Sequence, residues 1–144
     1  MIIVDSSVWF DLFTLNSSRR DLARKFFKEV ESLNLIILEP KVFEIEFVAL
    51  LSRRYGKSRT ISILNVIKEK TVILPNPDKI AFNIALNTGC RAIDSYFIAT
   101  AKVTSSILIT NDRIMADNAK KAEIEAYYLI EDFDRAVGRL KEIK

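Results

Sequence analysis

Residues 2–13, IIVDSSVWFDLF, contain the pattern that decides the fold. The run from Ile2 to Val4 is short and apolar, which predicts a buried strand. Asp5 ends this run, and the stretch from Ser7 to Phe13 has apolar residues at helical spacing. A buried strand that passes directly into a helix is the first half of a β–α unit, which predicts a parallel sheet.

The same alternation of strands and helices continues along the chain. Further strands are predicted at 35–38, 71–74, 107–109 and about 125–129. Helices are predicted at 18–33, 40–56, 58–69, 77–86, 92–103, 113–120 and 132–143, with Pro40 in the first turn of its helix and Gly56 as the stop of that helix. We therefore expect an α/β protein: a three-layer α/β/α sandwich with a central parallel sheet, in a single domain over residues 1–144.

The composition excludes several kinds of chemistry. The chain has no histidine and one cysteine, Cys90, so a Ser-His-Asp site, a Cys-His site and an internal disulfide cannot be built. The net charge of +3 permits a polyanionic partner without requiring one. No apolar run reaches the roughly 20 residues of a membrane span, and we expect a cytoplasmic protein with no membrane contact. Enzymatic chemistry would have to come from carboxylates.

Three acids occupy informative positions in this pattern. Asp5 and Asp112 each follow a predicted strand, at the edge where open parallel sheets bind ligands, although either could simply cap the next helix. Glu46 has apolar neighbours one turn away on its predicted helix, whereas Glu44 is expected to face solvent beside Lys41. A carboxylate on an apolar stripe suggests a functional site, with a snorkelling or ion-paired side chain as the alternative.

Asp94 lies near the start of the predicted helix 92–103, at the boundary between core and solvent, where it too could be a helix cap. Carboxylates that pack together repel one another unless a cation neutralises them. Hard divalent cations prefer oxygen ligands. A cluster of acids without histidine therefore predicts Mg²⁺ or Mn²⁺ as the cofactor.

Four segments together resemble the PIN-domain family, and particularly the VapC-type toxins of prokaryotic toxin–antitoxin pairs. These segments are IIVDSSVW (2–9), PKVFEIEFVALLSRR (40–54), RAIDSYFIATA (91–101) and SSILITNDRIMA (105–116). In the second segment the acid comes six residues after the proline, which also selects Glu46. Ser6 departs from the family pattern, in which threonine is common at that position.

The resemblance implies a metal-dependent ribonuclease that hydrolyses phosphodiester bonds of RNA with Mg²⁺ or Mn²⁺. It implies a homodimer and, for toxin members, an antitoxin protein whose tail covers the acidic site. The implied metal ligands and catalytic residues are Asp5, Glu46, Asp94 and Asp112, with Asp117 as a further acid near the metal. The implied supporting polar residues are Ser6, Ser7, Thr110 and Asn111.

Two other groups are weaker candidates for contacts with RNA or a partner. A basic group just beyond the Glu46 helix could hold RNA phosphates, or could interact with the carboxyl end of that helix. It consists of Arg53, Arg54, Lys57 and Arg59. Aromatic residues near Asp5 could stack on bases, although their helical spacing favours core or dimer packing. Apolar residues there could form an interface, although an internal core contains such residues more often. These residues are Val8, Trp9, Phe10, Leu12 and Phe13.

Competing classes fit the sequence less well. A phospho-acceptor receiver domain needs an aspartate at the end of a middle strand, but Leu38 is followed by Glu39 and Pro40. Haloacid-type phosphatases need a second aspartate two residues after the first, where this chain has Ser7. No glycine-rich phosphate loop is present. The alternatives that stay open are a PIN-like module that binds RNA or protein without cutting, and an RNA-processing nuclease without an antitoxin.

Overall fold

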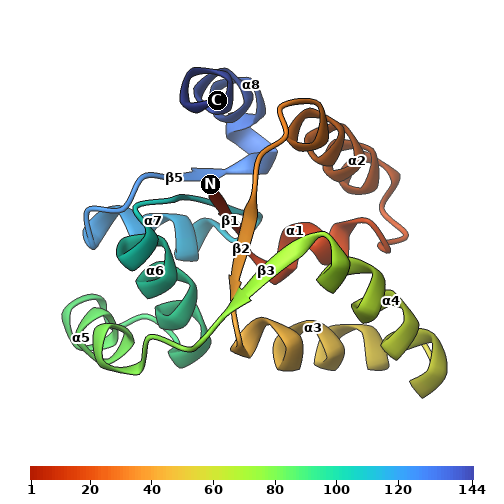
Figure 1. The fold of residues 1–144 in the computed structure, drawn as a ribbon, viewed down its shortest axis with the longest axis horizontal. Helices are drawn as coiled ribbons and strands as arrows, with labels where there is room; N and C mark the ends of the chain where they lie inside the picture. Colours follow the sequence, from red (N-terminus) through yellow and green to blue (C-terminus); the bar gives the residue numbers. More distant parts are fainter.

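A computed structural model describes residues 1–144 and has a parallel sheet of five strands at its centre (Figure 1). The strands are β1 (Ile2–Val4), β2 (Ile37–Pro40), β3 (Thr71–Leu74), β4 (Ile107–Thr110) and β5 (Ala126–Tyr128). Their order in the sheet is β3-β2-β1-β4-β5, and every neighbouring pair is parallel. The predicted α/β class with a central parallel sheet is confirmed.

Eight helices surround the sheet. They are α1 (Ser6–Asp11), α2 (Ser17–Ser32), α3 (Val42–Ser52), α4 (Lys57–Glu69), α5 (Asp78–Thr88), α6 (Ala92–Thr104), α7 (Arg113–Lys121) and α8 (Leu129–Ile143). Figure 1 shows α5, α6 and α7 on one side of the sheet, with α1, α2 and α4 on the other. None of these helices has the length and apolar character that crossing a membrane requires.

The strand order creates a switch point between β1 and β4. The chain first runs outward from β1 through β2 to β3, and then returns to the opposite side of β1 to form β4 and β5. In open parallel sheets, ligands bind outside the carboxyl ends of the strands at such a point. Asp5 follows β1 and Asp112 lies two residues after the end of β4, so both acids are at this edge.

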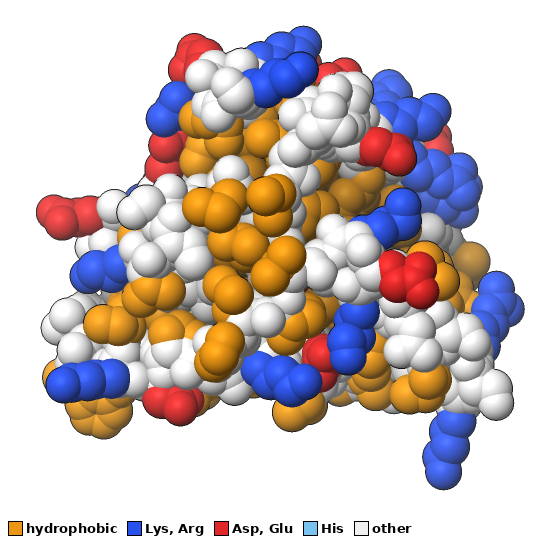
Figure 2. Space-filling view, in the orientation of Figure 1, with side chains coloured by type: hydrophobic (Ala, Val, Ile, Leu, Met, Phe, Trp, Pro, Cys, Tyr) orange, Lys and Arg blue, Asp and Glu red, His pale blue; other side chains and the backbone are white.

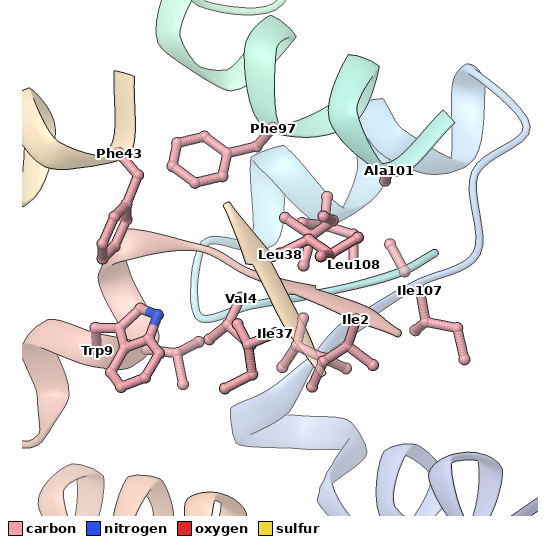
Figure 3. Packing of buried hydrophobic residues seen from close by; sticks show 14 of the residues in the cluster. Ile2, Val4, Trp9, Ile37, Leu38, Phe43, Phe97, Ala101, Ile107 and Leu108 are labelled. Atoms are coloured by element: carbon pink, nitrogen blue, oxygen red, sulfur yellow. The ribbon is translucent and has the colours of Figure 1, made fainter. Parts of the chain in front are cut away.

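The core fills both faces of the sheet, as Figure 3 shows. On one face, Leu38 and Leu108 lie beneath Phe97 of α6. On the other, Ile2 and Val4 pack on the side of α1 that carries Trp9, and all of these side chains are buried. Because short strands covered on both faces must be apolar throughout, the strand runs were readable from the sequence.

The structure corrects the predicted start and end of the second long helix. Pro40 is the last residue of β2, opposite Leu74, instead of lying in the first helical turn. Helix α3 begins at Val42, whose backbone N–H donates to the side-chain oxygen of Asn76 at 2.9 Å. It ends at Ser52, and Gly56 is the N-cap residue of α4, not the stop of α3. A cap supplied by a residue 34 positions away is a tertiary contact that the local pattern does not contain.

The aromatic residues near Asp5 belong to the core, not to a base-stacking surface. Trp9 is 3% exposed, and its ring lies 4.2 Å from that of Phe27 between centroids. Phe13 packs edge-on against Tyr55. Val8 is fully buried, so of the apolar residues considered for an interface only Leu12 reaches the surface.

Candidate active site

Asp5 is a buried carboxylate held by two hydroxyl groups. Its backbone N–H donates to the carbonyl of Ile109 at 2.9 Å, which continues the pairing of β1 with β4. Although Asp5 precedes α1, its side chain makes no capping bond. One carboxylate oxygen instead accepts from Ser7 Oγ at 2.6 Å and from Thr110 Oγ1 at 2.9 Å. Burial raises the pKa of Asp5 to about 6, with a further rise from Asp94, while the two hydroxyl bonds oppose it.

Asp112 caps the next helix, one of the two roles that the sequence left open, and it also pairs with a guanidinium. Its Oδ1 accepts from the backbone N–H groups of Ile114 and Met115, at 2.9 and 3.2 Å, and so caps α7. Its Oδ2 accepts from the guanidinium of Arg91 at 2.7 Å. The backbone N–H of Asp112 donates to Thr110 Oγ1 at 3.0 Å. Since the same hydroxyl donates to Asp5, Thr110 links the ends of the two neighbouring strands.

Glu46 is half-buried on α3 and interacts with acids from two distant parts of the chain. Burial raises the pKa of Glu46 to about 7, and nearby Asp5 and Asp94 raise it further. The buried hydroxyl of Ser6 has no partner at hydrogen-bonding geometry but lies close enough to oppose this rise, as does Arg91. The fold therefore brings Glu46 to the same edge of the sheet as Asp5.

The environment of Glu44 differs from the prediction. Its side chain is 16% exposed and pairs with Lys41 and Lys68, both at 2.8 Å, so it is a covered ion pair and not a solvent-facing acid. On the other side of the helix, Ala49 is exposed. The apolar stripe around Glu46 is therefore buried only at its amino-terminal end. Helix α4 covers a different flank of α3, the one that carries Glu44.

Asp94 is 3% exposed in the first turn of α6, and it does not cap that helix. It pairs with Arg91, which precedes the helix, through Nε at 3.1 Å and Nη2 at 3.3 Å. Burial raises the pKa of Asp94, nearby Asp112 raises it further, and the guanidinium of Arg91 opposes both effects. Arg91 was not singled out from the sequence, although its spacing of three residues from Asp94 at a helix start was a readable signal.

Glu39 is a second residue that the sequence reading missed. Its side chain is fully buried, and Oε1 accepts from the backbone N–H of Val4 at 3.3 Å and from the indole of Trp9 at 3.1 Å. Its other oxygen has no partner. Burial raises the pKa of Glu39 well above its usual value, and Asp5 and Glu46 raise it further. No local pattern separates Glu39 from an exposed acid, because its burial depends on α1 packing over β2.

Asp11 completes the polar network on the α1 side. It is 4% exposed and accepts from the side-chain amide of Asn111 and, at 3.2 Å, from Arg19. The backbone N–H of Asn111 donates to Ser7 Oγ at 2.9 Å. Three of the predicted supporting residues, Ser7, Thr110 and Asn111, therefore form hydrogen bonds around Asp5, and their role as supports remains a prediction.

The other predicted contact residues lie outside this network. Asp117 is exposed on α7 and makes no hydrogen bond or ion pair. Arg54 donates to the carbonyl of Phe13, and Arg59 lies 4.5 Å above the ring of Tyr55. Arg53 and Lys57 are exposed without such contacts. The structure gives Arg54 and Arg59 a packing role, and only Arg53 and Lys57 keep their charge free for a ligand.

The donor chemistry of the site fits a hard divalent cation, because every acid here offers carboxylate oxygen and the hydroxyl and amide groups around them are also hard donors. The arrangement is not yet a ligand cage, since no three acidic side chains converge closely enough to hold one ion. Instead, Arg91 holds Asp94 and Asp112. Metal binding at these acids would require side-chain rearrangement.

Comparisons with known proteins agree with this fold. The PIN domain family model matches residues 2–121. The structure resembles VapC20 of Mycobacterium tuberculosis, described as a sarcin-ricin loop cleaving toxin, with a TM-score of 0.66 and 13% identity over 81% of this chain and 94% of that one. It also resembles PAE2754 of Pyrobaculum aerophilum, with a TM-score of 0.65 and 16% identity over 98% of this chain and 89% of that one.

A third similar structure is FitAcB of Neisseria gonorrhoeae, with a TM-score of 0.62 and 16% identity over 88% of this chain and 96% of that one. A search of curated proteins found no match. Because the sequence identities are low, the structural similarity supports the fold alone. The family-model match shows to which family residues 2–121 belong.

Proposed function

Because this chain belongs to the PIN-domain family, we propose that it is a Mg²⁺- or Mn²⁺-dependent ribonuclease and the toxin of a VapBC-type toxin–antitoxin pair. The observation that carries the proposal is the meeting of acids from separate elements at the switch point of the sheet. Asp5 follows β1, Glu46 lies on α3 and Asp94 lies on α6. Asp94 raises the pKa of both Asp5 and Glu46, and Asp5 raises the pKa of Glu46. Asp112 is joined to them through Thr110 and Arg91.

The residues proposed to hold the ion are Asp5, Glu46, Asp94 and Asp112. The chemistry that such an ion supplies when bound is activation of water and stabilisation of the negative charge that develops on the phosphate. The chain itself orients the acids. Ser7 and Thr110 fix the Asp5 carboxylate from two sides, and the backbone of α7 fixes Asp112. Fixed ligands lose less conformational freedom when a cation binds.

Burial matters because carboxylates must lose their protons to bind metal. The pKa values of Asp5 and Glu46 are raised to about 6 and about 7, so these carboxyl groups bind protons near neutral pH more readily than exposed acids do. A divalent cation replaces those protons, and the repulsion among the acids then favours binding. The raised pKa values therefore support a cation site better than they support isolated structural acids.

The proposed substrate is RNA, and the proposed location is the cytoplasm. Exposed Arg53 and Lys57, near the carboxyl end of α3, offer charges for the phosphate backbone of a strand that reaches Glu46. VapC20 is described as a toxin that cleaves the sarcin-ricin loop, which supports RNA as the substrate class.

An antitoxin is the proposed partner. A cleft of about 640 Å³ beside the amino-terminal ends of β2 and β3, at the opposite end of the strands from the acids, offers it a docking surface. Trp9, Leu12 and Phe27 contribute the apolar lining of this cleft, and Arg24 and Lys28 contribute positive charge. A peptide segment with apolar residues flanked by acids would match this surface.

A homodimer is the proposed assembly. In Figure 2, hydrophobic side chains lie across the middle of the face that contains the edge strand β3. Exposed apolar residues of this part of the fold include Val72 of β3, at 47%, and Phe82 and Leu86 of α5, at 70% and 73%. Exposed apolar surface of this kind favours association.

The decisive experiment measures cleavage of a panel of labelled RNAs in Mg²⁺, Mn²⁺ or EDTA. We expect cleavage that requires metal and that is lost in Asp94→Asn and Glu46→Gln. Glu44→Gln is the matched control, because it makes the same change two residues away on α3, where the acid pairs with lysines instead of facing the site.

If no RNA is cut, and calorimetry detects no Mn²⁺ binding that depends on Asp94, the non-catalytic binding module becomes the better description. Metal-dependent cleavage without growth arrest on expression in a bacterial host would favour an RNA-processing nuclease without an antitoxin.

A further inference from the structure

Arg91 is the one cation that pairs with the acids of the site. Its guanidinium lies between two of them, at 3.1 Å from Asp94 Oδ2 through Nε and at 2.7 Å from Asp112 Oδ2 through Nη2. The two acids come from different elements, α6 and the turn before α7. The bridge thus joins the two sides of the acidic cluster.

The bridge supplies positive charge where the cluster otherwise has none. Asp5 and Glu46 form no ion pair, and Arg91 is the only basic group near enough to oppose the rise in the pKa of Glu46. The Arg91 side chain is nevertheless 72% exposed, so it reaches the cluster from the solvent side and is not locked in the core. Ion pairs this exposed are weak, because solvent screens them and the long side chain loses freedom in making them.

The two carboxylates that Arg91 occupies are both expected metal ligands. A divalent cation carries twice the charge of a guanidinium and binds carboxylate oxygens directly, so the two cations compete for the same atoms. Once displaced, the guanidinium stays tethered three residues from Asp94, beside the metal. Its forked donors match a phosphate as well as a carboxylate, and an RNA strand brings phosphate to this position.

We propose that Arg91 is an exchangeable cation of the active site: it bridges Asp94 and Asp112 in the metal-free protein, yields them to the divalent ion, and then binds the RNA phosphate. This inference rests on the proposed function, because it takes the acids as metal ligands and RNA as the substrate. It adds a substrate-binding residue from within the third sequence segment, separate from the basic group beyond α3.

The first test is calorimetric titration of Mn²⁺ into the metal-free full-length protein, its Arg91→Ala variant and its Arg91→Lys variant. We expect Arg91→Ala to bind Mn²⁺ about threefold or more tightly than the original protein, since the two pairs made by this exposed arginine no longer compete. Arg91→Lys should lie between them, because lysine keeps the charge but not the fork. Arg135→Ala is the matched control: Arg135 is an arginine of α8 whose side chain is 76% exposed, and it pairs with Asp132 three residues away, outside the acidic cluster.

The second test measures binding of a 2′-O-methyl RNA oligonucleotide that a gel shows to remain intact, by fluorescence anisotropy. We expect Arg91→Ala to weaken binding several-fold in Mn²⁺ and to change it little in EDTA, where the guanidinium is already engaged by the acids. Circular dichroism of each variant checks that the fold is retained.

Unchanged or weaker Mn²⁺ binding by Arg91→Ala, or an equal loss of RNA binding with and without Mn²⁺, would overturn the inference. In the first case the proposed function survives, provided that Asp94→Asn still abolishes Mn²⁺ binding. If Arg91→Ala binds Mn²⁺ tightly and the original protein shows no binding, the competition between Arg91 and the metal ion is strongly supported. If neither protein binds Mn²⁺, both the inference and the metal-dependent function fail.

Discussion

Replacing Asp5 by asparagine should remove activity and, at neutral to alkaline pH, increase the stability of the metal-free protein. The two hydroxyls that hold Asp5 both donate to one carboxylate oxygen, and an asparagine carbonyl oxygen can accept both. The fold therefore keeps its hydrogen bonds. What the substitution removes is a buried acid that must ionise in order to bind a cation.

The magnitude follows from the pKa of Asp5, which is raised from 3.8 to about 6. Between these values the folded protein retains a proton that the unfolded chain has lost, so stability falls as pH rises through this interval and stays lower above it. At about 1.4 kcal/mol per pH unit, the loss for this single group is about 3 kcal/mol. Asparagine does not titrate, so Asp5→Asn should be more stable than the original protein by up to about 3 kcal/mol at pH 8, and by much less near pH 4.

Urea unfolding in EDTA at several pH values between 4 and 8 measures this difference directly. Asp21→Asn is the matched control, because it makes the same change at an exposed position of α2. Cleavage assays on the same preparations should find no activity in Asp5→Asn. A stability difference that is independent of pH would refute the assignment of Asp5 as a buried acid with a raised pKa, and full activity would remove it from the mechanism.

Two further predictions concern residues that support the site, Glu39 and Asn76. Glu39→Leu leaves two buried donors without an acceptor and should lower the free energy of unfolding by about 2–5 kcal/mol. Glu39→Gln keeps an acceptor and should change the free energy of unfolding by less than about 1 kcal/mol. Equal stability of the two variants in urea at pH 7 would contradict the hydrogen bonds assigned to Glu39. Asn76→Ala removes the acceptor for the first N–H of α3 and should cost about 1 kcal/mol and reduce cleavage, because α3 carries Glu46. Asn83→Ala, an exposed change on α5, is its control, and identical thermal unfolding of the two variants would show that Asn76 is not a cap.

The fold was largely readable because its signals are local. Buried parallel strands are apolar over most of their length, which made the central strands β1, β2 and β4 visible as short runs, and the partly exposed edge strands β3 and β5 were also placed from their β-forming residues. Helix ends were less readable, because some caps come from far along the chain. Asn76 caps α3, and Gly56, which reads as a helix stop, precedes α4 instead.

The sequence by itself determined which residues could do chemistry. Without histidine, and with acids placed after strands and on an apolar helix stripe, carboxylates and a hard cation were the remaining choice. The order of the motifs, from Asp5 to Asp112, was enough to identify the family to which residues 2–121 belong.

Only the tertiary structure decided how these residues meet. It joined Asp5 to Thr110 across 105 positions, buried Glu39 beneath Trp9, and turned Arg91 onto two acids of the site. The physical reason is that burial and ion pairing depend on which helices and strands pack together. Residue type and spacing show only which side chains lie on each face of a single helix or strand. The types of functional groups could therefore be read from the local sequence, whereas their pKa shifts and ion pairs depend on contacts between distant segments.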